Sequence, residues 1–251
     1  MALNLKTLGI RSISAVVFVM ALLGSVLWNY YSFTIFFFIV ALIGLNEFYK
    51  IAEKLGAKPY KIAGFISGII VYLSFINPFF LIYDSELKNK LIYILVLLPF
   101  VIFTVALFSK KEFPVKNFLY TIVGLIYAVL PFSLLSELVI IHEQEKNMYE
   151  FYPKIILGVI FLIWSNDTFA YLGGSLFGKH KMIERISPGK TWEGTIFGIL
   201  LTFGISFLIK IYLIKTTGNL WPLLGIIVPI LATIGDLVES MLKRQDRKSV
   251  V

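Results

Sequence analysis

Apolar residues occur in long runs along the whole chain, separated by short polar segments. Helices that cross a bilayer need about 20 consecutive apolar residues, and these runs approach that length. The regular alternation over ~10 residues that a transmembrane strand requires does not occur. We therefore predict an all-α fold, a polytopic transmembrane helix bundle of about eight spans. The predicted spans are residues 12–28, 31–47, 62–82, 91–108, 118–141, 154–172, 195–214 and 221–239.

Lysine and arginine gather in alternate segments between these spans. Most of the 23 basic residues lie near the two termini and in residues 48–61, 109–117 and 173–194. Basic residues are enriched in cytoplasmic loops, so this distribution predicts that both termini face the cytoplasm. The first apolar run has no small-residue cleavage site, and we expect it to be a retained span rather than a signal peptide. We expect a multi-pass protein of the cell (inner) membrane.

The amino-acid composition excludes several kinds of partner and site. The chain is 58% hydrophobic and carries a net charge of +8, and this charge follows the membrane topology, which argues for a lipid bilayer and against nucleic acid as a partner. There is no cysteine, so disulfides and a thiol nucleophile are excluded. The two histidines are too few for a histidine-rich zinc site.

Three groups of polar residues interrupt the apolar pattern in the second half of the chain. The first contains Asn166 and Asp167, inside a predicted span. A carboxylate at mid-membrane costs roughly 2.5–3.5 kcal/mol, so Asp167 needs a cation, a metal or an aqueous cavity. Tyr171 follows four residues later and shares its helical face. A functional site and an interfacial cluster at a helix end are both compatible with this pattern.

The second polar group is the segment 187–194, in which a Pro-Gly pair is expected to break regular structure. Lys190 offers a point charge that can hold a phosphate, and Thr191 offers a hydroxyl. Three roles stay open for Glu193: a metal ligand, a partner that orients Lys190, or a cap of the following helix. The segment is also compatible with a simple helix start.

The third polar group lies on one helical face near the C-terminus. Asp236, Glu239 and Ser240 are spaced i, i+3 and i+4, and Lys243 continues the same face. Mg²⁺ typically takes one or two carboxylates together with substrate phosphates, so this face suits Mg²⁺ and a phosphate. The alternative is a helix exit with an ion pair. In the predicted orientation, all three polar groups lie toward the cytoplasmic side.

These segments resemble the phosphatidate cytidylyltransferase (CDP-diacylglycerol synthase) family in residue types, order and spacing. The resemblance rests on residues 166–179, 187–194 and 235–244, whereas the first half of the chain matches only as a hydrophobic bundle. The family condenses CTP with phosphatidic acid to give CDP-diacylglycerol and pyrophosphate, with Mg²⁺. We expect residues 1–141 to form a transmembrane scaffold and residues 142–251 the catalytic part of one membrane unit.

The resemblance also implies roles for individual residues. The lipid phosphate attacks the α-phosphorus of the nucleotide, so metal and cations matter more than a covalent nucleophile. The expected catalytic residues are Asp236, Lys190 and Asp167. The expected substrate-binding residues are Asn166, Tyr171, Ser187, Thr191, Glu193, Ser240, Lys243 and Arg244. The expected metal ligands are Asp236 and Glu239.

The sequence departs from the family pattern after Arg244. The family continues with a Lys-Asp pair, a Pro-Gly-His-Gly-Gly turn and an Asp-Arg-hydrophobic-Asp string, whereas residues 245–251 read QDRKSVV. If those aspartates complete the metal site, we expect this polypeptide to bind Mg²⁺ poorly and to turn over little. The alternatives are another CTP-dependent membrane lipid kinase or transferase, a membrane transporter, or an inactive truncated form. A homodimer stays open.

Overall fold

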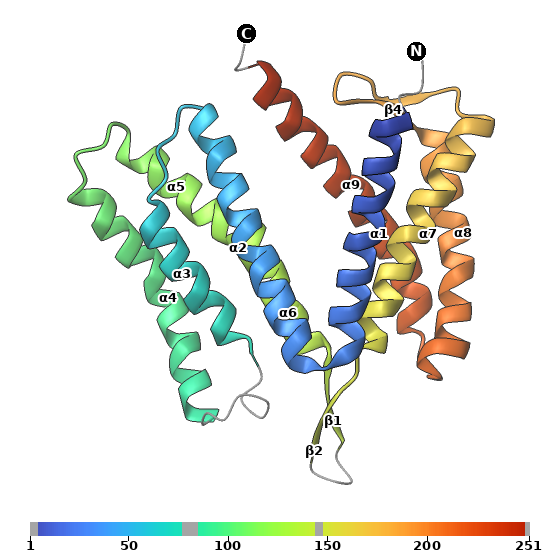
Figure 1. Ribbon diagram of the computed structural model, residues 1–251, viewed down its shortest axis with the longest axis horizontal. Coiled ribbons are helices and arrows are strands. Elements are labelled where there is room, and N and C mark those ends of the chain that lie inside the picture. The colour runs from blue at the N-terminus through green and yellow to red at the C-terminus, as the bar shows by residue number, and fades with distance from the viewer. Residues whose placement is uncertain (1–4, 77–84, 144–147, 249–251) are drawn as a thin grey trace. The chain divides into compact units, whose positions relative to one another are not determined.

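The computed structural model describes residues 5–76, 85–143 and 148–248, and most of them are helical (Figure 1). Among these residues, five helices are long and apolar enough to cross a membrane. They are Tyr30–Lys54, Pro114–Leu138, Lys154–Phe177, Trp192–Ile214 and Leu220–Leu242. The predicted all-α, membrane-type bundle is therefore confirmed at this level. The number of eight spans and the cytoplasmic termini stay predictions.

The chain forms two compact units. The first comprises Met1–Ala52 and Ala57–Pro153, and the second Glu53–Gly56 and Lys154–Val251. The first unit contains helices α1 (Leu5–Trp28), α2 (Tyr30–Lys54), α3 (Lys61–Ser74), α4 (Ser85–Leu107), α5 (Pro114–Gly124), the π-helical turn η1 (Leu125–Val129), α6 (Leu130–Leu138) and strands β1 (Ile140–Glu143) and β2 (Met148–Phe151). The two strands pair antiparallel, with Ile140 opposite Phe151.

Hydrogen bonds attach the segment before α3 to helix α5. The Lys58 backbone N–H donates to Asn117 Oδ1 over 2.6 Å, and the Tyr60 N–H donates to Thr121 Oγ1 over 2.9 Å. The Tyr49 hydroxyl of α2 donates to the Thr121 carbonyl over 3.1 Å. Because a buried backbone group without a partner costs free energy, these bonds fix this end of the first unit.

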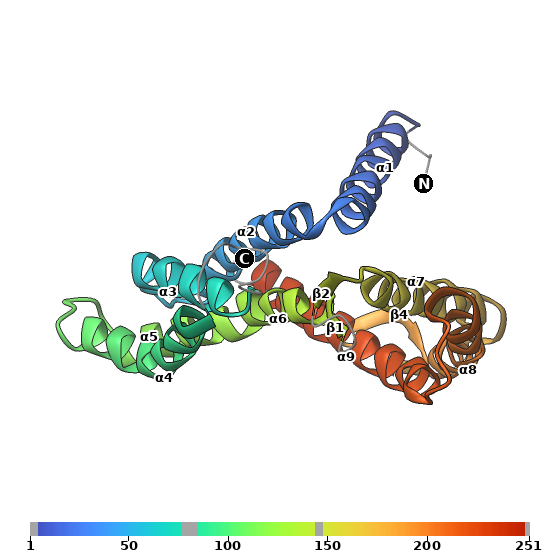
Figure 2. The same cartoon turned by 90° about the horizontal axis from the view of Figure 1, so that it is seen from below.

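The second unit contains three packed helices and one small hairpin. Its elements are α7 (Lys154–Phe177), β3 (Lys181–Ile183), β4 (Ser187–Thr191), α8 (Trp192–Leu208), the π-helical turn η2 (Ile209–Ile214) and α9 (Leu220–Lys248). Helix α8 packs against both α7 and α9 (Figure 2). The hairpin β3–β4 lies at the end where α7 stops and α8 begins, with Lys181 opposite Thr191 (Figure 1).

Glycines allow α7 and α8 to approach closely. A Cβ atom on Gly194 would lie 2.6 Å from the Ala170 carbonyl oxygen, and one on Gly198 would lie 2.9 Å from Asn166 Oδ1. Small residues at helix interfaces permit this backbone approach in membrane proteins. As a result, the polar turn of α7 lies directly beside the first turns of α8.

An apolar cluster stabilises the other part of this unit. Leu162, Ile209 and Trp221 are buried together, one each from α7, η2 and α9. Gly158 leaves room for the Trp221 ring, because a Cβ at that position would collide with it. Burying side chains of this size contributes the apolar stabilisation that positions α9 against α7.

Two local predictions were wrong. The glycine-containing segment after residue 172 is not a loop, because α7 continues to Phe177 and the Gly178 N–H still donates to the Gly174 carbonyl over 3.1 Å. The Pro-Gly pair does not break regular structure but lies within strand β4, where a two-stranded edge tolerates proline. The predicted span 118–141 corresponds to the continuous helical segment Pro114–Leu138, which contains the π-helical turn η1 just before Pro131. The predicted span 62–82 ends outside the described residues.

Candidate active site

A pocket of about 240 Å³ opens in the second unit, and residues from all three polar groups line it. Helices α7, α8 and α9 and strand β4 each contribute to its wall. The lining residues are Asn166, Asp167, Ala170, Tyr171, Gly189, Lys190, Thr191, Thr195, Thr233 and Asp236. Segments separated by some 70 positions in the sequence therefore meet at one site.

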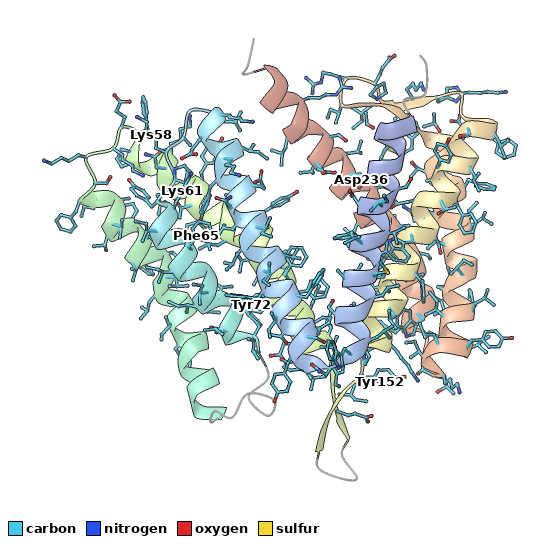
Figure 3. The ribbon with its side chains drawn as sticks, in the orientation of Figure 1. Lys58, Lys61, Phe65, Tyr72, Tyr152 and Asp236 are labelled. Carbon is cyan, nitrogen blue, oxygen red and sulfur yellow. The ribbon has the colours of Figure 1, made fainter. Side chains whose placement is uncertain are left out.

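An ion pair joins the second and third polar groups. Lys190 Nζ donates to Asp236 Oδ2 over 2.7 Å. Figure 3 labels Asp236 on α9. The side chains are 27% and 51% exposed, so both are partly solvated. Exposed pairs of this kind contribute only about 0–1 kcal/mol to stability, so we expect this contact to add little to the stability of the fold. The ion pair matters for the geometry of the site, because it brings a cation and a carboxylate together at the pocket.

Helix α7 forms one wall of the pocket and supplies a second carboxylate, Asp167. Asp167 lines the pocket and is exposed, whereas Asn166 is almost fully buried against α8. Its Oδ1 atom has no hydrogen-bond partner among the described residues. The neighbouring Thr168 does not enter the site, because its hydroxyl donates to the Trp164 carbonyl one turn earlier. Tyr171 is exposed at the rim.

The first turn of α8 forms another wall of the pocket. Thr191 is the N-cap of this helix, and its Oγ1 accepts a hydrogen bond from the Gly194 N–H over 3.2 Å. The Thr195 hydroxyl donates back to the Thr191 carbonyl over 3.1 Å. A helix N-terminus carries partial positive charge and favours bound anions. Together with Lys190, this end of α8 gives the pocket two features that attract phosphate.

Some predicted site residues do not line the pocket. Of the residues that the structure describes, Ser187, Glu193, Glu239, Ser240 and Arg244 are absent from its wall. The Lys243 side chain lies outside the described part of the structure. Glu239 and Ser240 follow Asp236 by about one helical turn on α9, further along the helix than the pocket.

The sequence reasoning missed two threonines that line the pocket. Thr233 precedes Asp236 by three residues on α9, and Thr195 follows Thr191 by four residues at the start of α8. Both spacings place the threonine on the same helical side as a residue that was predicted. Helical spacing counted backward from Asp236, and forward from Thr191, would have identified them.

The oxygen atoms of the pocket fit a hard cation. Across the described residues, no group of three or more His, Cys, Asp or Glu side chains gathers to hold a metal by itself. The pocket nevertheless offers two carboxylates, Asp167 and Asp236, with hydroxyls beside them. Mg²⁺ commonly binds through one or two carboxylates and completes its shell with water and substrate phosphates. The donor set therefore fits Mg²⁺ that arrives with a phosphorylated substrate.

Comparison with known proteins gives one consistent result. The model of the Cytidylyltransferase family matches residues 9–247. A phosphatidate cytidylyltransferase of Staphylococcus aureus (strain COL) is 28% identical over 241 residues, which is 94% of this chain and 85% of that relative. Proteins of the same name from Staphylococcus saprophyticus and Staphylococcus epidermidis (strain ATCC 35984) are 28% and 27% identical over 239 residues, with the same coverage.

The family match agrees with the resemblance that the polar segments carry, and it extends well beyond them into the first half of the chain. The pocket, with its paired Lys190 and Asp236, lies within the matched residues. This chain belongs to the cytidylyltransferase family.

Proposed function

We propose that this chain transfers the cytidylyl group of CTP to phosphatidic acid, giving CDP-diacylglycerol and pyrophosphate for phospholipid biosynthesis. One observation carries the proposal: the three family-like segments meet at a single pocket with a lysine–aspartate pair and a second aspartate. The names of the relatives support the same reaction. A pocket bordered by apolar helices also suits a substrate that resides in the bilayer.

The reaction requires charge neutralisation more than covalent catalysis. A phosphate oxygen of phosphatidic acid attacks the α-phosphorus of CTP, and the bond from that phosphorus to the oxygen bridging to the β-phosphate breaks. Pyrophosphate leaves with the bonding electron pair. Negative charge builds on the reacting phosphates during this step, and preorganised cations and hydrogen-bond donors lower its barrier.

Lys190 and the α8 N-terminus are suited to hold the nucleotide phosphates. The Lys190 ammonium is a point charge with three donors, already directed to the pocket by Asp236. Thr191 Oγ1 accepts from Gly194, so its hydroxyl hydrogen is left to donate to a phosphate oxygen. Thr195 and Thr233 add hydroxyls to the same wall.

Asp236 and Asp167 are the residues suited to hold Mg²⁺. When bound, Mg²⁺ supplies positive charge to the triphosphate and to the departing pyrophosphate. Glu239 stays a predicted additional ligand. Asn166, Tyr171, Ser187, Ser240, Lys243 and Arg244 stay predicted substrate-binding residues, whereas the Glu193 carboxylate contacts Lys179 and His180 instead. CTP is a cytoplasmic nucleotide, so we further propose a multi-pass protein of the cell membrane whose pocket faces the cytoplasm.

The test is product identification with purified protein in mixed micelles. CTP and phosphatidic acid are supplied with Mg²⁺, and CDP-diacylglycerol and pyrophosphate are quantified together. The expected result is equimolar formation of the two products, with none when phosphatidic acid is omitted or Mg²⁺ is chelated. Diacylglycerol in place of phosphatidic acid serves as the matched control for a lipid kinase. Phosphorylation of diacylglycerol, without any CDP-diacylglycerol in the phosphatidic acid arm, would contradict the proposal.

A further inference from the structure

The carboxylate of Glu193 binds the turn that follows α7. Its Oε1 lies 2.6 Å from His180 Nδ1. It also accepts hydrogen bonds from the backbone N–H groups of Lys179 and His180, each over 3.2 Å. The Glu193 side chain is 27% exposed, whereas His180 is 79% exposed. One carboxylate therefore holds three donors that all belong to the chain just before β3.

This turn is the base of the hairpin that carries Lys190. The Trp192 N–H donates to the His180 carbonyl over 3.0 Å, so the turn is bonded to α8 in the opposite direction as well. Strand β3 then pairs with β4, with Lys181 opposite Thr191. Gly178 packs against Thr191, because a Cβ there would lie 2.9 Å from Thr191 Oγ1. The contacts of Glu193 and of the α8 N-cap Thr191 therefore hold the start of strand β3 and the end of strand β4.

We infer that Glu193 is a positioning residue: through His180 and the backbone of the turn, it holds hairpin β3–β4 so that Lys190 reaches Asp236 and the pocket. The role of Lys190 toward CTP rests on the function proposed above. Glu193 is not among the described residues that line the pocket, and its oxygens are occupied by the three donors. The inference therefore assigns Glu193 to the turn and not to the metal or the nucleotide.

The kinetic test compares Glu193→Gln, His180→Ala and the double variant with wild type. Gln keeps the size of the side chain but loses the charge that strengthens all three hydrogen bonds. We expect Glu193→Gln to raise KM for CTP roughly tenfold and to change kcat by less than about twofold, because a displaced Lys190 loses uniform binding of phosphate. The Mg²⁺ concentration for half-maximal rate is expected to stay unchanged. Glu184→Gln, an exposed carboxylate on the same hairpin, is the matched control and is expected to leave KM unaltered.

The double variant distinguishes a positioning role of Glu193 from direct binding of the metal or the substrate by its carboxylate. If Glu193 acts through the turn, the effects of Glu193→Gln and His180→Ala on KM overlap, and the double variant resembles the stronger single one. Additive effects, or a Mg²⁺ requirement that shifts in Glu193→Gln alone, would instead assign Glu193 to the metal or the substrate and overturn the inference. An unchanged KM in Glu193→Gln would overturn it as well.

A second measurement does not depend on catalysis. The chain has no cysteine, so a single Gly189→Cys variant accepts one spin label on β4, where a Cβ has open space. The inference predicts an ordered electron paramagnetic resonance line shape that becomes mobile when Glu193→Gln is added and stays ordered with Glu184→Gln. An unchanged line shape in Glu193→Gln contradicts the positioning role. If wild type fails to form CDP-diacylglycerol, the proposed function fails, while this measurement still decides the role of Glu193.

Discussion

Replacing Asp236 with asparagine separates the chemistry of the pocket from the stability of the bundle. Asp236→Asn keeps the side-chain size but removes the charge that faces Lys190 at 2.7 Å. The two side chains are 27% and 51% exposed, so water screens their interaction, and its contribution to stability is at most about 1 kcal/mol. For a chain of this length, that loss lowers Tm by no more than about 4 °C.

The expected effect on catalysis is much larger. Removing one preorganised electrostatic group from an active site typically lowers kcat about 10²- to 10³-fold, equivalent to about 2.7–4 kcal/mol. Asp236 is proposed both to bind Mg²⁺ and to orient Lys190, so we expect a loss of at least this size. The assay is the rate of CDP-diacylglycerol formation at saturating CTP and Mg²⁺, with a thermal melt of the same preparation. Glu239→Gln, one turn further along α9, tests whether a second carboxylate on this helix matters comparably.

A rate for Asp236→Asn within about threefold of wild type would refute the reasoning, because a metal-binding carboxylate cannot be lost at so small a cost. A decrease in Tm of far more than 4 °C would refute the expectation that this ion pair contributes little to stability. That result would mean that the Lys190 ion pair stabilises the bundle instead of only joining two walls of the pocket.

Three further predictions follow from individual contacts. Lys190→Ala is expected to raise KM for CTP with a smaller effect on kcat, because it removes a phosphate contact; an unchanged KM in steady-state assays would count against this role. Thr191→Ala is expected to lower stability by about 1 kcal/mol through loss of the N-cap, and Thr191→Ser to restore it, as followed by thermal unfolding. Gly194→Ala is expected to destabilise the protein by about 1–3 kcal/mol, since its Cβ would meet backbone atoms of α7. Gly204→Ala on the same helix, where a Cβ has open space, is its control, and equal melting temperatures for the two would contradict the packing argument.

The helical character of the chain and the convergence of its polar groups could be predicted from sequence for physical reasons. Long apolar runs have few stable forms other than spanning helices, and a carboxylate such as Asp167 within one of them requires a compensating site. The i, i+3 spacing on α9 predicted that Asp236 and Glu239 share one helical side and both belong to the site. In the structure Asp236 lines the pocket, and Glu239 does not.

The hairpin and the role of Glu193 could not be predicted in the same way. Strands β3 and β4 are short, and their pairing depends on tertiary contacts at Gly178 and Thr191 that leave no periodic pattern in the sequence. The contact between Glu193 and His180 joins positions 13 residues apart across that hairpin. Local spacing therefore left three roles open for Glu193, and only the folded turn distinguishes among them.

The central claim is that CTP donates its cytidylyl group and not its terminal phosphate. The most direct measurement supplies the purified protein, phosphatidic acid and Mg²⁺ with CTP labelled in parallel at the α- or the γ-phosphate, and follows label entering the lipid fraction. The account predicts that α-label enters the lipid in a one-to-one ratio with pyrophosphate released, and that γ-label stays in pyrophosphate. Entry of γ-label into lipid would identify a kinase, and absence of both labels from lipid would contradict a transferase acting on phosphatidic acid.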